Sequence, residues 1–252
     1  MIKYLGLPID ASKDGPGVDN LMLYVHLLML ALFIGWVSYF LYAVWRFRAS
    51  ANPKADYDGV KNHASTWIEV IVALVEGILL IGFAIPLWGH AVEAFPEAKD
   101  NPTVIKLIGQ QFQWNARYPG PDNVFGSNDV RFVASTNQFG LDYSDAHAKD
   151  DFSVVSELQV PVNKPVIVHI TSLDVIHCFA IKPMRVTQDA IPGLSIPAWF
   201  TPVKEGQYQI NCAQLCGNGH SSMHGYLKVV SQADYDKWVA SKSAGSKTTS
   251  FE

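Results

Sequence analysis

The sequence has few cysteines, few charges and no basic excess. Its 252 residues include only three cysteines, which excludes the disulfide framework of a small secreted domain. Charged residues make up 17% of the chain, a low share for a soluble protein of this size. The formal net charge of −4 offers no basic footprint, so we expect no nucleic-acid partner. The first twenty residues contain no apolar run, so we expect no cleaved signal peptide at this start.

Two long apolar runs near the N-terminus account for much of the hydrophobic content. Leu21 to Trp45 contains no charged residue, and Trp67 to Trp88 contains only Glu69 and Glu76. Each run is long enough to cross a hydrocarbon core of roughly 30 Å as a helix. The loop between them is basic, with Arg and Lys at positions 46, 48, 54 and 61, and is therefore predicted to be cytoplasmic. The alternative is a buried helical hairpin in a soluble core.

After Pro96 the pattern changes to short alternating segments separated by Gly, Pro and Asn, which is typical of a β-sandwich or barrel. We expect a short helix over Ala233–Lys242 and a long surface loop over Pro119–Asp151. The predicted organisation is an exported tail (1–20), a helical hairpin (21–92, spans about 21–46 and 67–89), a β domain (93–242) and a polar tail (243–252). The predicted strands are Val104–Trp114, Phe152–Val160, Val166–Ser172, His177–Ile181, Trp199–Pro202, Gln207–Cys212 and Tyr226–Val230.

One short segment gathers soft and borderline metal ligands. Cys212, Cys216, His220 and Met223 lie within twelve residues, and His177 in an upstream strand is the best candidate for a second imidazole. A disulfide, a tetrahedral zinc site and a copper site all remain open from the residue types. The thioether favours copper, because Met is a natural ligand of copper but not of zinc.

The ligand spacing resembles that of a known family. Cys-x3-Cys-x3-His-x2-Met, with an upstream Asp-x2-His and the segment Asp189-Ala-Ile-Pro-Gly193, is similar to subunit II of haem–copper cytochrome c oxidases over nearly the whole chain. The resemblance implies two N-terminal transmembrane helices followed by an all-β cupredoxin-like sandwich. It also implies a dinuclear copper centre, CuA. Its ligands would be the bridging thiolates of Cys212 and Cys216, the imidazoles of His177 and His220, the thioether of Met223 and the carbonyl of Gln214.

The same resemblance implies a role in respiration. The chain would take electrons from cytochrome c or a similar donor and pass them to haem in catalytic subunit I, where oxygen is reduced to water and protons are pumped. Its other partners would be further oxidase subunits and membrane lipid. The implied location is the bacterial inner membrane, with several spans and the CuA domain on the exported, periplasmic side. No Cys-x-x-Cys-His motif occurs, so we expect no haem on this chain.

The chain departs from the family pattern at the aromatic segment. Many members have a tryptophan where Phe112 stands, and that residue is usually assigned as the point where the electron enters. Trp114 is retained. The contact with the donor could therefore be made by Phe112 and its neighbours, or the electron could enter through Trp114 or by a different route. The structural alternative for Trp114 is a packed residue of an aromatic strand. Asp174 is the acidic residue we expect in a docking face, because it is close to His177 in the sequence.

Two further departures concern magnesium and protons. Gln214 stands where many members have a glutamate that helps to hold magnesium, and a neutral amide is a weaker magnesium ligand, so we do not predict magnesium. Glu69 and Glu76 in the second apolar run are candidates for a proton path, since ionisable residues inside a membrane are functional hypotheses by default. The structural alternative for Glu76 is a protonated side chain bonded to a neighbouring helix.

Two other functions remain to be weighed. A quinol-oxidase-type subunit II has the same architecture but lacks the copper ligands. A membrane-tethered copper chaperone or sensor would need an exposed, exchangeable site and would not need the paired spans.

Overall fold

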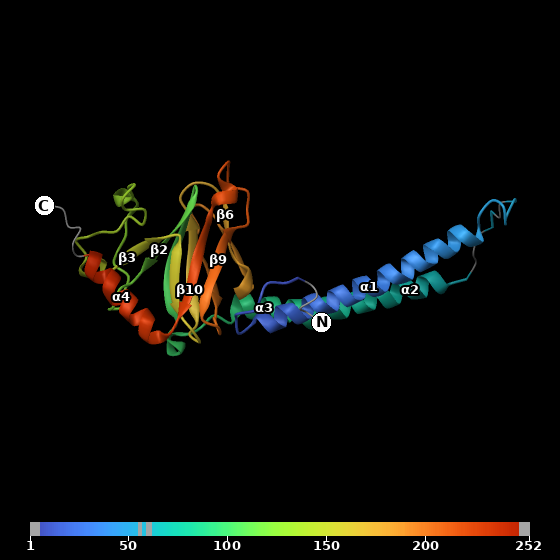
Figure 1. The fold of residues 1–252 in the computed structure, drawn as a ribbon, viewed down its shortest axis with the longest axis horizontal. Coiled ribbons are helices and arrows are strands. Elements are labelled where there is room, and N and C mark those ends of the chain that lie inside the picture. The colour runs from blue at the N-terminus through green and yellow to red at the C-terminus, as the bar shows by residue number, and fades with distance from the viewer. Residues whose placement is uncertain (1–5, 55–56, 59–61, 247–252) are drawn as a thin grey trace. The chain divides into compact units, whose positions relative to one another are not determined.

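The computed structural model describes residues 6–54, 57–58 and 62–246, and it divides into two compact units (Figure 1). The helical unit contains Gly17–Glu93. The β unit contains Ala94–Glu252 and, in addition, the segment Gly6–Pro16.

The helical unit consists of two long apolar helices. Helix α1 runs over Gly15–Arg46, and the second helix is built from α2 (Ala64–Leu79), the π-helical turn η2 (Leu80–Ala84) and α3 (Ile85–Glu93). At 1.5 Å per residue both exceed the thickness of a bilayer core. None of the residues in their most apolar windows is buried by the rest of the chain, so neither is the core helix of a soluble domain. Their apolar surfaces require lipid or other membrane proteins.

The β unit is a sandwich of two five-stranded sheets, in the strand orders β3-β2-β1-β5-β8 and β4-β10-β9-β6-β7. The predicted class, two apolar helices followed by a β-sandwich, is confirmed. The first sheet contains β1 (Thr103–Gln110), β2 (Gln113–Tyr118), β3 (Phe152–Val155), β5 (Val166–Ser172) and β8 (Ile196–Phe200). The second contains β4 (Glu157–Pro161), β6 (His177–Ile181), β7 (Val186–Ala190), β9 (Gly206–Cys212) and β10 (His224–Val230).

Two of the predicted strands are each split in two. The expected strand Val104–Trp114 is a hairpin, because the chain turns at Gln111 and Phe112 and β1 pairs antiparallel with β2. The expected strand Phe152–Val160 breaks at Ser156, which has a φ of +53°. Its first half pairs with β2 and its second half with β10, so the chain passes from one sheet to the other at this residue. Strand β7 was not predicted.

The core lies between the sheets and is closed at its sides by other elements. Helix α4 (Gln232–Ser246) places Trp238 edge-on against Tyr118, with ring centroids 5.0 Å apart. On another side lies the segment Gly6–Pro16, whose Ala11 is completely buried. Backbone hydrogen bonds hold this segment in place, from Ala11 N–H to the carbonyl of Pro183 (2.9 Å) and from Val203 N–H to the carbonyl of Ala11 (2.8 Å). Residues 6–14, which precede the first helix, are therefore part of the folded β unit.

The segment 119–151 contains no strand of the two sheets, as expected for a surface excursion. A buried ion pair between Arg117 on β2 and Asp151 ties it to the sandwich.

Candidate metal centre

Three segments converge at one end of the β unit. They are the β1–β2 turn, the loop before β6 and the loop between β9 and β10. The carbonyl of Gly109 accepts a hydrogen bond from Leu173 N–H at 3.1 Å, which joins the first segment to the second. The carbonyl of Cys216 accepts one from Gln111 Nε2 at 2.6 Å, which joins the first to the third. Of the predicted ligands, His177 begins β6 directly after the second segment, and the other five lie at the end of β9 or on the loop that follows it.

The donor atoms of the six predicted ligands form one connected cluster. The sulfurs of Cys212 and Cys216 are 3.8 Å apart. Nδ1 of His177 lies 3.9 Å from the sulfur of Cys212, and the carbonyl oxygen of Gln214 lies 3.1 Å from the same sulfur. The other two distances centre on Cys216, whose sulfur is 3.6 Å from Nδ1 of His220 and 3.8 Å from the sulfur of Met223.

The arrangement does not match one of the three alternatives that the residue types left open. A disulfide has sulfurs about 2.05 Å apart, so both cysteines are free thiols here. Burial, and after it the neighbouring Cys212, raises the pKa of Cys216 to about 11. A metal that binds here must therefore displace thiol protons, as thiolate-bound metals do.

Four of the six predicted ligands are buried, whereas His220 is half-buried and Gln214 is exposed. His177 is fully buried, and Cys212, Cys216 and Met223 are 8%, 4% and 2% exposed. His177, Cys212 and Cys216 offer three donor atoms that all lie within 4.8 Å of one another. Two thiols, two imidazoles and a thioether are soft and borderline donors, and this set fits copper better than magnesium or calcium.

The orientation of His177 is set by Asp174. Nε2 of His177 lies 2.8 Å from Oδ1 of Asp174, so the imidazole donates there and presents the lone pair of Nδ1 to the sulfurs. Burial alone would raise the pKa of Asp174, but hydrogen bonds from Gln111 N–H and His177 lower it below its usual value. Gly109 leaves room for the ring, because a Cβ at that position would lie 2.9 Å from Cδ2 of His177.

The two aromatic candidates for the donor contact lie at different depths. Trp114 is completely buried, with its ring 6.0 Å from that of His177. Phe112 is 38% exposed and lies over the β9–β10 loop, where a Cβ on Gly219 would be 2.5 Å from its ring. Trp114 therefore has no exposed surface for direct contact with another protein, whereas Phe112 has.

The remaining predicted residues lie apart from this cluster. Glu69 and Glu76 are exposed residues of α2 in the helical unit. The third cysteine, Cys178, is buried on β6, and burial together with Asp189 raises its pKa to about 12. This agrees with its interpretation as a core thiol.

Sequence reasoning missed Gln111. Its side chain reaches the Cys216 carbonyl and its backbone N–H donates to Oδ2 of Asp174 at 2.7 Å. The adjacent Phe112 was predicted as a possible contact for the electron donor, but not as a residue of a turn. No turn-forming residue marks this hairpin, so the sequence had no local signal for it.

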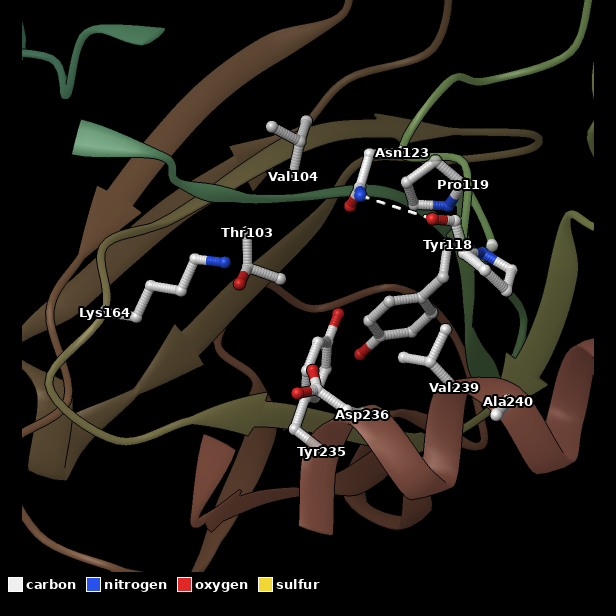
Figure 2. A pocket seen from close by; sticks show the side chains of 12 residues that line it. Thr103, Val104, Tyr118, Pro119, Asn123, Lys164, Tyr235, Asp236, Val239 and Ala240 are labelled. Carbon is white, nitrogen blue, oxygen red and sulfur yellow. Dashed lines mark hydrogen bonds between the residues drawn. The ribbon is translucent and has the colours of Figure 1, made fainter. Parts of the chain in front are cut away.

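Another hollow in the β unit has a different character. It is a cavity of about 240 Å³. Figure 2 shows its lining side chains, which include the phenols of Tyr118 and Tyr235, together with Thr103 and Lys164. Thr103 begins β1, whereas the copper-type ligands lie beyond the end of that strand, roughly 23 Å away at about 3.3 Å per residue. The lining contains no cysteine, histidine or methionine.

Comparison with known proteins identifies the family. Residues 103–230 match the family model described as the periplasmic domain of cytochrome c oxidase subunit II. The alternative cytochrome c oxidase subunit 2 of Bradyrhizobium diazoefficiens is 31% identical over 210 residues, which cover 82% of this chain and 74% of the relative. Cytochrome c oxidase subunit 2 of Cereibacter sphaeroides is 30% identical over 251 residues, which cover 95% and 80%.

A solved structure of the periplasmic domain of subunit II of cytochrome oxidase from Bradyrhizobium japonicum is 33% identical. It aligns with 57% of this chain and 94% of its own, at a TM-score of 0.42. The family predicted from the ligand spacing is confirmed, and with it a membrane-anchored subunit of an oxidase complex that has an exported domain. The chain belongs to the cytochrome c oxidase subunit II family.

Proposed function

We propose that this chain holds a dinuclear CuA centre and relays electrons from cytochrome c to haem in the catalytic subunit of a haem–copper oxidase. The ligands would be Cys212, Cys216, His177 and His220, with Met223 and the carbonyl of Gln214 in weaker positions. Oxygen reduction and proton pumping would take place on the catalytic subunit, so the chain contributes to an enzyme without carrying its oxygen-reducing site.

One observation carries the proposal: the donor atoms of all six predicted ligands lie in an unbroken series of contacts between 3.1 and 3.9 Å. Two copper ions that share two thiolates would spread one electron's charge over both metals. The protein supplies every ligand, so a substrate has no open position to occupy. The buried ligands exclude water and limit movement, which suits electron transfer.

The alternatives fit the residues less well. A zinc site uses four ligands and has no place for the thioether or a carbonyl. A copper chaperone needs a site that exchanges its metal, whereas His177 is fully buried and Cys216 is 4% exposed. A quinol-oxidase-type subunit lacks these ligands, and this sequence contains all of them.

Metal content and electron paramagnetic resonance of the full chain in detergent test the centre. We expect two copper ions per chain and a hyperfine pattern from one unpaired electron shared by two copper nuclei. Cys216→Ser should lose the shared-electron signal, because it removes a bridging thiolate. Cys178→Ser is the matched control and should retain the signal, because Cys178 is absent from the ligand cluster. One copper per chain, or zinc alone under copper-replete conditions, would refute the dinuclear centre.

We propose that the donor docks on a rim of exposed apolar side chains around the ligand loops, made of Phe112, Val175, Ile176 and Leu215. Their exposed fractions are 38%, 39%, 44% and 77%. Within the three rim segments, 109–112, 172–177 and 212–220, Asp174 is the only residue among Asp, Glu, Lys and Arg. Docking would therefore rest mainly on apolar contact, with Phe112 as the residue through which the electron enters.

Stopped-flow reduction by cytochrome c at varied salt tests this surface. A single carboxylate contributes at most about 1 kcal/mol to an exposed ion pair, so the rate should fall by less than about fivefold as salt rises. Leu215→Ser and Phe112→Ser should slow reduction at every salt concentration, and Leu194→Ser, an exposed apolar residue outside the rim, should not. A rate that collapses with salt would contradict apolar docking.

The chain's own packing supports a proposed membrane arrangement. Residues 6–14 are folded into the β unit, which supports placing this segment on the same side of the membrane as the β unit. An even number of spans between them meets this condition, and the family model describes a periplasmic domain. We propose a bacterial inner membrane, with Glu69 and Glu76 on a path for protons that continues in the catalytic subunit.

A further inference from the structure

The tip of the β1–β2 hairpin touches both segments that carry the predicted copper ligands. Gln111 donates its backbone N–H to Oδ2 of Asp174 at 2.7 Å, and the other oxygen of that carboxylate accepts from His177. The side-chain amide of Gln111 donates to the carbonyl of Cys216 at 2.6 Å. One residue therefore connects an imidazole on β6 with a thiol on the β9–β10 loop, 39 positions apart in the chain.

The glycines of the loop make this contact possible. A Cβ on Gly217 would lie 2.7 Å from Nε2 of Gln111, and one on Gly219 would lie 2.5 Å from Cδ2 of Phe112. Gly217 also has a φ of +132°, which side-chain-bearing residues rarely adopt. The hairpin tip therefore lies directly on the backbone between Cys216 and His220, where a residue with a side chain would push it away.

The loop has few other restraints from outside. The amides of Cys212 and Ala213 are bonded to the carbonyls of Met223 and Cys178, and these bonds hold the start of the loop. Further along, the loop's own backbone bonds within it, from His220 N–H to the carbonyl of Gly217 and from Ser222 N–H to that of Gly219, and the sulfur of Cys216 contacts other ligand atoms. Among the residues that the structure describes, and apart from the ligand contact between His177 and Cys212, Gln111 supplies the side-chain hydrogen bond that reaches this loop from another part of the fold.

We propose that Gln111 is a positioning residue for the metal centre. Its side chain fixes the position of Cys216, and its backbone N–H fixes the orientation of His177 through Asp174. The imidazole on β6 and the thiol on the β9–β10 loop are thereby held in a constant relative position. The inference rests on the proposed copper centre and adds a residue that is not a ligand. A fixed geometry matters for electron transfer because ligands that do not shift on reduction keep the reorganisation barrier small.

Gln111→Met in the full chain in detergent tests the side-chain arm. Methionine has nearly the same length but donates no hydrogen bond. The loss of one net hydrogen bond predicts about two- to tenfold faster removal of copper by a chelator. We also expect an altered hyperfine pattern and a shifted midpoint potential. Gln113→Met is the matched control, because Gln113 bonds to Asn115 Oδ1 at 3.0 Å and does not touch the loop.

The metal-free chain provides a readout that does not depend on copper. Hydrogen exchange at the amides of residues 213–219 should be about two- to tenfold faster in Gln111→Met than in the wild type or the control. Gln111→Glu, which keeps the shape but replaces the donating NH₂ with an acceptor, should behave like Gln111→Met. These two variants guard against a misfolded protein being taken for a positioning effect.

A cycle with Asp174→Ala tests whether the two arms act together. If Gln111 aligns both segments, its substitution should change the copper-loss rate less in the Asp174→Ala background than in the wild type. Equal exchange, copper loss and potential in Gln111→Met and the wild type would overturn the inference. A wild-type chain that binds no copper pair, with loop exchange still faster in Gln111→Met, would instead refute the copper centre and leave the hairpin contact standing.

Discussion

The side chain of Arg117 holds the long excursion 119–151 against the sandwich, and its removal should strongly destabilise this part of the fold. Arg117 Nε donates to Oδ2 of Asp151 at 3.0 Å, and Nη2 donates to the carbonyl of Gly126 at 2.6 Å. The amide of Gly126 donates to the same carboxylate oxygen at 3.0 Å. Both charged side chains have no exposed surface. We predict the outcome of Arg117→Met, which retains the length of the side chain and removes the guanidinium.

The expected loss of stability in Arg117→Met follows from the burial of the Arg117–Asp151 ion pair. Removing one member of a buried ion pair leaves the other charge uncompensated and costs about 3–5 kcal/mol. The carboxyl cannot fully avoid this cost. Burial raises the pKa of Asp151 and hydrogen bonds from Arg117 oppose that rise, so loss of Arg117 pushes the pKa higher still. A protonated Asp151 in the variant should make the deficit smaller at pH 5 than at pH 8.

Hydrogen exchange of the amides of β2, measured on the full chain in detergent, reports the effect. At 1.36 kcal/mol per tenfold, the loss corresponds to exchange that is roughly a hundred- to several thousandfold faster. Arg131→Met is the control, because the Arg131–Asp129 pair is exposed and exposed ion pairs contribute little to stability. If the two variants accelerate exchange to within fivefold of each other, the buried pair does not fasten the excursion. The double variant Arg117→Met/Asp151→Leu should recover much of the loss, because it buries no charge.

Three further predictions concern other parts of the chain. Gly219→Ala should lower the free energy of unfolding of the metal-free protein by about 1–3 kcal/mol in a denaturant titration, because the new Cβ overlaps the ring of Phe112; an unchanged midpoint would contradict the close contact. Hydrogen bonds from Ser127 lower the pKa of Asp145 to about 2. The stability that the ionised carboxylate gives to the excursion is therefore present above about pH 4 and is lost as the pH falls towards 2. Limited proteolysis of the excursion should therefore increase over that range in the wild type, and Asp145→Asn should remove the pH dependence. Glu76→Gln should slow turnover of the assembled oxidase while its copper content stays unchanged, and full turnover would remove Glu76 from the proposed proton path.

The types of the residues and their short spacing along the chain were enough to predict most of the chemistry of the site. Cys212, Cys216, His220 and Met223 lie in one loop, so their distance along the chain already limits their distance in space. The two apolar runs were equally easy to predict from the sequence, because a bilayer requires about twenty apolar residues in succession whatever surrounds them. The family followed from these two features together with Asp174 and His177.

The secondary structure around the site was harder to predict from the sequence. The expected single strand through Val104–Trp114 is a hairpin, and its turn residues, Gln111 and Phe112, are not of the types that mark turns. The break at Ser156 was also invisible, because alternation of polar and apolar residues continues when a strand passes from one sheet to the other. Pairing with distant strands decides both features, and a local pattern does not report it.

The sequence by itself determined which candidate metal ligands the chain carries, that two helices are apolar enough to span a membrane, and the family to which the chain belongs. These properties depend on residue types and on spacing within short segments. The tertiary structure alone decided that Trp114 is buried and Phe112 exposed, that Gly6–Pro16 is part of the β unit, and that Gln111 lies on the Cys216 loop. Those properties depend on which distant segments pack together, because burial and hydrogen bonding between them are set by the whole sandwich.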